Sequence, residues 1–127
     1  MQCVVETEHF RRAASDAQMS EDEVSRLKNL LANSPMAGDP IPGTGGARKL
    51  RFAKPGRGKS GSYRVVTFYT GEDIPVFLMD VYAKGDKINL SAAERAELKE
   101  ELHAFAAEYR DSIRDRVQEM KKAEVAS

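Results

Sequence analysis

The sequence contains few of the residues that build the common metal-binding and redox centres. Its 127 residues include one cysteine, Cys3, and two histidines, His9 and His103. A lone cysteine cannot form an internal disulfide bond, which is typical of a protein from a reducing cytoplasm. No Cys/His cluster is present to bind zinc. Because Cys3 adjoins the apolar residues Val4 and Val5, we expect it in the core, with a reactive thiol as the alternative.

Net charge and long hydrophobic runs are also missing. The 20 basic and 20 acidic residues cancel, so the overall charge identifies no partner. No run approaches the roughly 18 apolar residues that a membrane span needs, and no signal peptide is recognisable. Asp80 and Asp86 are too isolated to suggest a two-metal nuclease centre. We therefore expect a cytoplasmic protein that needs no metal, no cofactor and no membrane.

The N-terminal part of the chain predicts two short helices. An extended segment over residues 2–6 is followed by Thr7, a suitable N-cap for the first helix. Ser20 and Glu23 form a capping box that begins the second helix. That helix ends near Pro35, because the residue before a proline disfavours helical geometry.

The middle of the chain reads as three strands. Residues 48–52 alternate between basic and apolar side chains, while residues 62–70 and 75–84 are rich in β-branched and aromatic residues. The last two strands are expected to form an antiparallel hairpin around the turn at residues 71–73. Prolines and glycines in residues 40–46 predict a turn-rich connection before the first of the three.

A second capping box, Ser91 to Glu94, begins a helix that we expect to run to about residue 120. Its part from Leu98 to Phe105 is expected to pack on the sheet and cover Leu50 and Phe52. The order β-α-α-β-β-β-α indicates an α+β fold: a small, mostly antiparallel sheet with two N-terminal helices and a long C-terminal helix. We expect a single domain over residues 1–120 and a disordered tail over residues 121–127.

Positive charge gathers on the predicted strands. Between residues 48 and 64 no acidic residue interrupts the cations Arg48, Lys49, Arg51, Lys54, Arg57, Lys59 and Arg64. Strand alternation places Lys49 and Arg51 on one face, and Arg64 and Lys84 stand within otherwise apolar strands. Four cations on one sheet face suit a phosphate backbone, although a solvated basic face is the alternative.

The segment Ala53 to Ser60 resembles a phosphate-binding P-loop with alanine in place of the first glycine. A P-loop requires a buried strand before it and a helix after it, whose N-terminus holds the phosphates. Here a strand follows the segment, so we do not expect this loop to bind a nucleotide.

Several motifs together resemble a known family. They are Gly43-Thr44-Gly45-Gly46, Arg48-Lys49-Leu50-Arg51-Phe52, Gly56-x-Gly58-Lys59-Ser60-Gly61, Tyr63-Arg64-Val65-Val66, Val81-Tyr82-Ala83-Lys84 and Asn89-Leu90-Ser91. Over roughly residues 1–110 the chain resembles the HigB branch of the RelE/ParE toxin superfamily, and the segment beyond Arg110 exceeds the usual family length. The resemblance implies a toxin of a type II toxin–antitoxin pair. Its partners would be a helix-turn-helix antitoxin, the ribosome and mRNA, which it would cut without metal.

The resemblance also implies roles for the cations. The catalytic set falls on Lys49, Arg51, Arg64 and Lys84. Contacts to RNA or the ribosome fall on Arg48, Lys54, Arg57, Lys59, Tyr82 and Lys87. Several family members have a tyrosine near the start of the last helix, where this chain has Leu90, so that function is absent or moved to Tyr82. A half-buried strand aromatic is the alternative for Tyr82.

The mechanism inferred from these residues is attack of a ribose 2′-OH on the adjacent phosphate. Arg64 would stabilise the phosphoryl oxygens, Lys49 would act as base and Lys84 as acid. The neighbouring cations Arg51 and Arg64 would favour the uncharged amine of Lys49. No histidine is expected to take part. The rival class is a non-enzymatic inhibitor, such as a ParE-like gyrase poison or a basic nucleic-acid-binding module.

The end of the long helix carries an apolar stripe of Ile113, Val117 and Met120, which lies beyond the reach of a domain of this size. Such a stripe marks a partner surface, for the antitoxin or a second copy of the chain. A frayed, highly charged tail is the alternative.

Overall fold

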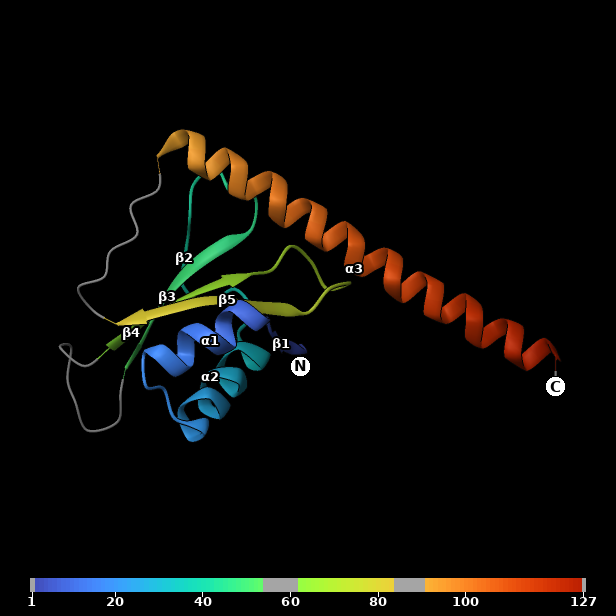
Figure 1. Cartoon of the computed structure of the whole chain (residues 1–127), viewed down its shortest axis with the longest axis horizontal. Coiled ribbons are helices and arrows are strands. Elements are labelled where there is room, and N and C mark those ends of the chain that lie inside the picture. Colours follow the sequence, from blue (N-terminus) through green and yellow to red (C-terminus); the bar gives the residue numbers. More distant parts are fainter. Residues whose placement is uncertain (1, 54–61, 84–90, 127) are drawn as a thin grey trace.

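The computed structural model describes residues 2–53, 62–83 and 91–126 (Figure 1). One short strand opens the chain and two short helices follow it. The remaining strands come next, and one very long helix ends the chain. The elements are β1 (Val4–Glu6), α1 (Glu8–Asp16), α2 (Glu21–Asn33), β2 (Asp39–Pro40), β3 (Ala47–Ala53), β4 (Ser62–Phe68), β5 (Val76–Ala83) and α3 (Ala92–Ala126). This is the α+β architecture that the sequence predicted.

The strands form one sheet with the order β1-β5-β4-β3-β2. The β1 strand pairs with β5 in parallel, and all other pairs are antiparallel, including the predicted hairpin of β4 and β5. The sequence did not predict β2, because two residues among prolines and glycines leave no strand pattern. Asp39 and Pro40 nevertheless pair with Lys49 and Arg48 at the edge of the sheet.

Both N-terminal helices begin as predicted. The Thr7 hydroxyl accepts a hydrogen bond from the Phe10 amide at 3.1 Å. The Ser20 hydroxyl accepts from the Glu23 amide at 3.1 Å, and the Glu23 carboxylate accepts from the Ser20 amide at 2.9 Å. These bonds satisfy amide groups that a helix N-terminus otherwise leaves unpaired.

The sheet is covered on both faces, each with its own core (Figure 1). Helices α1 and α2 cover one face, where Phe10 and Leu27 are fully buried and where Phe52 and the half-buried Leu50 also pack. The prediction that α3 covers Leu50 and Phe52 was therefore wrong. Strand alternation turns those two residues toward α1 and α2, so α3 has to pack on the opposite face.

On that opposite face α3 packs over the end of the sheet formed by β4 and β5. Leu102 and Ala106 of α3 lie in a buried cluster with Phe68 and Phe77. The ring of Phe77 contacts Phe105 edge-on, with 4.7 Å between the centroids. The same ring lies 5.5 Å from that of Tyr109. Edge-to-face aromatic pairs add to the free energy of ordinary apolar burial, so they fix this part of α3 on the sheet.

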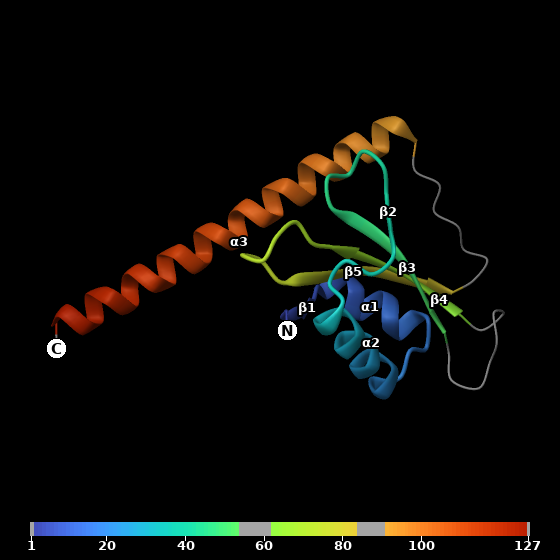
Figure 2. The ribbon, with the colours of Figure 1, turned by 180° about the vertical axis from the view of Figure 1, so that it is seen from behind.

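The α3 helix continues to Ala126, past residue 120 where we expected it to end and a disordered tail to begin. No glycine or proline occurs within it, so nothing in the local sequence interrupts the helix. Figures 1 and 2 show its C-terminal half projecting well beyond the sheet. Within the described parts of the chain, no helix combines the length and apolarity needed to cross a bilayer.

Cys3 is exposed, contrary to the expectation that it lies in the core. The residues around it alternate along an edge strand: Val4 packs against the core, while Val5 is 39% exposed. Adjacent apolar residues in a strand point to opposite faces, so an apolar run alone does not bury every member.

Candidate active site

Two rows of side chains cross the sheet on the face that α3 covers. Arg51, Arg64 and Tyr82 are directly opposite one another on β3, β4 and β5. The neighbouring row holds Lys49, Val66 and Asp80. The structure thus brings three of the predicted cations, Lys49, Arg51 and Arg64, together with the predicted Tyr82. Strand pairing, which the sequence does not specify, creates this arrangement.

Arg64 occupies the centre of the first row. It is half-buried, and its Nη1 atom is buried with no hydrogen-bond partner among the described residues. A buried polar atom without a partner costs about 1–3 kcal/mol, and more when it is charged. Directly opposite stands the like-charged Arg51. An anion bound between these guanidinium groups would relieve both costs, and a phosphate fits the planar, forked geometry of arginine.

A bulge in β5 determines which side chains join the site. Val66 pairs with Asp80 and the next residue, Thr67, pairs with Leu78, so Met79 is the extra residue on β5. Met79 and Asp80 consequently line the same side of the sheet, and Tyr82 follows there. Bulges commonly redirect side chains beside active sites. The sequence does not reveal this bulge, because residues 76–79 are all apolar and show no alternation that a bulge could interrupt.

A groove of about 810 Å³ is lined by the second row and by Tyr82 of the first row, but not by Arg51 or Arg64. Its walls come from the sheet, from the segment 39–42, from the start of α1 and from α3. The lining residues are His9, Asp39, Pro40, Ile41, Pro42, Lys49, Val66, Met79, Asp80, Tyr82, Arg95, Leu98 and Glu101. The groove combines apolar side chains with several charged ones, and its volume lies in the range of small-molecule sites.

His9 belongs to this groove although no sequence motif indicates it. The β1 strand ends beside Leu78, whose carbonyl accepts both the amide and the hydroxyl of Thr7. The chain then enters α1, and His9 Nε2 lies 3.4 Å from Asp80 Oδ1. The imidazole is well exposed, as expected for a surface histidine, while the Asp80 side chain is 26% exposed. An imidazole held by a carboxylate is a common acid–base arrangement.

The surroundings of Tyr82 move the pKa of its hydroxyl further from neutral pH. Burial raises the pKa of its hydroxyl above the ordinary value of 10.0, Arg64 partly offsets this and Asp80 adds to it. The hydroxyl, which is protonated at neutral pH even without this shift, therefore stays a hydrogen-bond donor to a higher pH.

The other predicted contact residues do not join this site. Arg48 alternates to the opposite face of β3, where its Nη1 donates to the Gly38 carbonyl at 3.2 Å. Lys84 of the predicted catalytic set lies outside the described residues. So do the predicted contact residues Lys54, Arg57, Lys59 and Lys87, together with the P-loop-like segment. Within the described ranges, no group of three or more His, Cys, Asp or Glu side chains is arranged to hold a metal ion.

A family model for the RelE toxin of the RelE/RelB toxin–antitoxin system matches residues 2–125. The chain belongs to the RelE toxin family. This RelE-family chain is thus the toxin component of a toxin–antitoxin system, and the family implies an antitoxin partner. The match continues past Arg110, so the expectation that the family resemblance ends there was wrong. The second half of α3 falls within the matched range.

Proposed function

We propose that this RelE-family toxin inhibits translation as an endoribonuclease that cuts mRNA on the ribosome, in the manner of the HigB-like branch. The observation that carries the proposal is the row of Arg51, Arg64 and Tyr82, with a buried guanidinium nitrogen that has no partner among the described residues. This row can bind a negatively charged phosphate and stabilise the additional charge of a phosphoryl transition state.

In the proposed reaction the ribose 2′-oxygen forms a bond to the adjacent phosphorus while the bond from phosphorus to the 5′-oxygen breaks. The products are a 2′,3′-cyclic phosphate and a 5′-hydroxyl. Arg64 stabilises the equatorial oxygens, and Lys49 in the next row accepts the 2′-OH proton. Lys84 donates the proton that the 5′-oxygen takes up. These three steps need no bound metal, which makes metal-independent cleavage part of the proposal.

His9 and Asp80 give the groove a second candidate for proton transfer. Their contact of 3.4 Å places an imidazole in a groove that Lys49 and Tyr82 also line. This favours a role for His9 beside the lysines, contrary to the expectation from the sequence that no histidine takes part.

Dependence on the ribosome follows from the weakness of these acid–base groups. Lysine amines are poor general bases because they are ordinarily protonated at neutral pH, so accurate positioning of the substrate has to supply part of the rate, and the ribosome can provide it. The cations Lys54, Arg57, Lys59 and Lys87 would contact ribosomal RNA phosphates.

Expression of the chain in bacteria tests the proposal. We expect growth and translation to stop, with new 5′-hydroxyl ends in mRNA, and we expect the Arg64→Ala variant to fold and to be harmless. With purified translating ribosomes, cleavage should survive removal of protein-bound metal by a chelator once magnesium is restored for the ribosomes.

The same experiment distinguishes the non-enzymatic rival. A gyrase poison would change DNA supercoiling and leave mRNA intact. In a basic binding module, Arg64→Ala would lower the affinity for nucleic acid, and the size of this loss would depend on the salt concentration. In an enzyme, the same substitution would lower the cleavage rate with little loss of binding. Intact mRNA during growth arrest would refute the ribonuclease proposal.

A further inference from the structure

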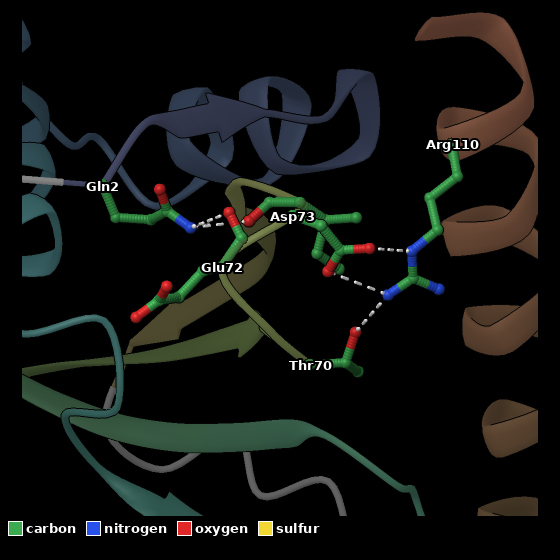
Figure 3. A network of polar contacts seen from close by, with 6 residues as sticks. Gln2, Thr70, Glu72, Asp73 and Arg110 are labelled. Carbon is green, nitrogen blue, oxygen red and sulfur yellow. Dashed lines mark hydrogen bonds and ion pairs between the residues drawn. The ribbon is translucent and has the colours of Figure 1, made fainter. Parts of the chain in front are cut away.

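The second half of α3 projects from the domain and carries an apolar stripe without cover from its own chain. Arg110 is fixed to the body: its side chain donates to Asp73, with Nε at 2.5 Å from Oδ2, and to the Thr70 hydroxyl at 3.4 Å (Figure 3). Every side chain from Asp111 to Ala123 is exposed. Within this segment Ile113 is 40%, Val117 42% and Met120 66% exposed.

The turn that holds Arg110 is itself anchored, so the direction of the projecting helix is set by the body. The Gln2 side chain donates to the carbonyls of Glu72 at 3.2 Å and Ile74 at 2.8 Å, on the other side of that turn (Figure 3). Together with the ring contacts of Phe77, these bonds hold α3 where it leaves the sheet. The stripe therefore lies on a helix whose point of departure from the sheet is held by these contacts.

Charge is sorted around the stripe. An α-helix turns about 100° per residue, so Ile113, Val117 and Met120 share one face. The residues that border this face are Arg114, Arg116 and Lys121. The acidic residues of the same segment, Asp111, Asp115 and Glu119, fall toward the opposite side. The stripe is thus apolar at its centre and positive along both borders.

We propose that this face of α3 is the docking surface for an amphipathic, acidic segment of the antitoxin. The partner's apolar side chains would cover Ile113, Val117 and Met120, and its aspartates and glutamates would pair with the bordering cations. Helix-in-groove recognition of this kind relies on apolar anchors at helical spacing, while charged borders select the partner. The proposal rests on the family's antitoxin partner and does not depend on ribonuclease activity.

The pattern disfavours two other occupants. A second copy of the chain packed symmetrically on this face would bring the bordering cations of one copy close to those of the other, and like charges repel at close range. Ribosomal RNA would satisfy the cations, but its phosphates would leave the three apolar side chains without a partner. An acidic protein segment satisfies both parts of the surface.

The test measures binding directly, with the toxin carrying Arg64→Ala so that it can be produced. The probe is the purified product of the reading frame next to this gene, where a toxin–antitoxin pair encodes its antitoxin. Calorimetry compares the full-length chain with a stripe variant, Ile113→Lys with Val117→Lys. The matched control, Ser112→Lys with Gln118→Lys, adds the same charge away from the stripe. Circular dichroism verifies that both variants remain helical.

We expect the stripe variant to raise the Kd at least about tenfold, since each buried apolar side chain contributes more than one such factor. The control should stay within about twofold of the parent chain. Reversing the borders with Arg114→Glu and Arg116→Glu should also weaken binding and reduce its salt dependence.

Three results would overturn the proposal. The first is unchanged affinity in the stripe variant. The second is a change of oligomeric state in light scattering. If the parent chain is a dimer and the stripe variant is a monomer, the surface belongs to a second copy of the chain. The third is loss of toxicity when the stripe substitutions are placed in the active toxin without antitoxin, which would assign it to the ribosome. Absence of ribonuclease activity alone would overturn only the proposed function, because the binding measurement does not use it.

Discussion

Arg51 and Arg64 lie directly opposite each other on the antiparallel strands β3 and β4. Like charges in this position destabilise a sheet, and Arg64 also has a buried nitrogen without a partner among the described residues. A fold that only needed stability would not place these two residues together. The pair is the arrangement expected of a site whose charge is neutralised when an anionic substrate binds.

The first prediction concerns this pair. We expect Arg64→Gln to abolish cleavage and to raise the free energy of unfolding by about 0.2–1 kcal/mol, because it removes the repulsion between directly opposite charges. Urea denaturation and the cleavage assay measure the two effects. Arg48→Gln is the matched control on the same sheet. Arg48 of β3 pairs with the uncharged Thr67 of β4, so its replacement removes no repulsion between like charges and no stabilisation is expected. An active or destabilised Arg64→Gln variant would contradict this account of the site.

The second prediction separates the two histidines. If His9 transfers a proton in the groove, His9→Gln should lower the cleavage rate by about 10²-fold with little effect on substrate affinity. His103→Gln should keep the rate, because His103 packs beside Gly45 and does not line this groove. Single-turnover cleavage on ribosomes measures both. Equal rates for the two variants would remove His9 from the mechanism.

The third prediction concerns the glycine turn under α3. Gly45 has φ +74°, and a Cβ atom there would lie 2.5 Å from His103 Nε2. Gly43 has φ +79°, but its Cβ would meet Arg95 at an ordinary 3.7 Å. Both alanine substitutions should cost about 1–3 kcal/mol of stability from backbone strain. Gly45→Ala should lose slightly more, because the exposed His103 ring has to rotate away from the new methyl group.

The double variant Gly45→Ala with His103→Ala should be as stable as Gly43→Ala in thermal denaturation, because it lacks the contact between the new methyl group and the His103 ring. Adding His103→Ala should not help Gly43→Ala. If His103→Ala rescues both variants or neither, the turn and α3 do not contact each other in this way.

The fourth prediction concerns acid stability. Burial raises the pKa of Glu23, but hydrogen bonds from the Ser20 amide, the Tyr63 hydroxyl and the Ser20 hydroxyl outweigh it, and Arg26 adds to them. The net pKa lies below its ordinary value of 4.5. A depressed carboxyl pKa stabilises the fold at pH values above the unfolded pKa, and this contribution is lost as the pH falls through the folded pKa.

Glu23→Gln should therefore be less stable than the parent chain at pH 7, and the difference in urea titrations should shrink as the pH is lowered progressively below 4.5. The Tyr63→Phe variant removes one of the bonds, at 3.1 Å, and should show a smaller difference with the same sign. A difference between the parent chain and Glu23→Gln that is independent of pH would mean that the carboxylate charge does not contribute.

Local sequence signals predicted the elements whose physics is local. The caps at Thr7 and Ser20, the hairpin of β4 and β5 and the alternation of Lys49 with Leu50 depend on residues a few positions apart. The two-residue strand β2 and the continuation of α3 to Ala126 were missed. The first is too short to show a period, and the second lacks a stop signal within a charged segment.

Tertiary structure decided the composition of the site. The sequence by itself determined that Lys49 and Arg51 share a face, because side chains alternate along a strand, and the family motifs indicated which cations to examine. Only strand pairing placed Arg64 opposite Arg51, and only the bulge at Met79 turned Asp80 toward the groove. Because β1 ends where Glu6 pairs with Leu78 of β5, the chain enters α1 close to Asp80, and His9 can approach that carboxylate. These relationships join residues far apart in the chain, and the free energies that select them come from packing the whole sheet between its helices.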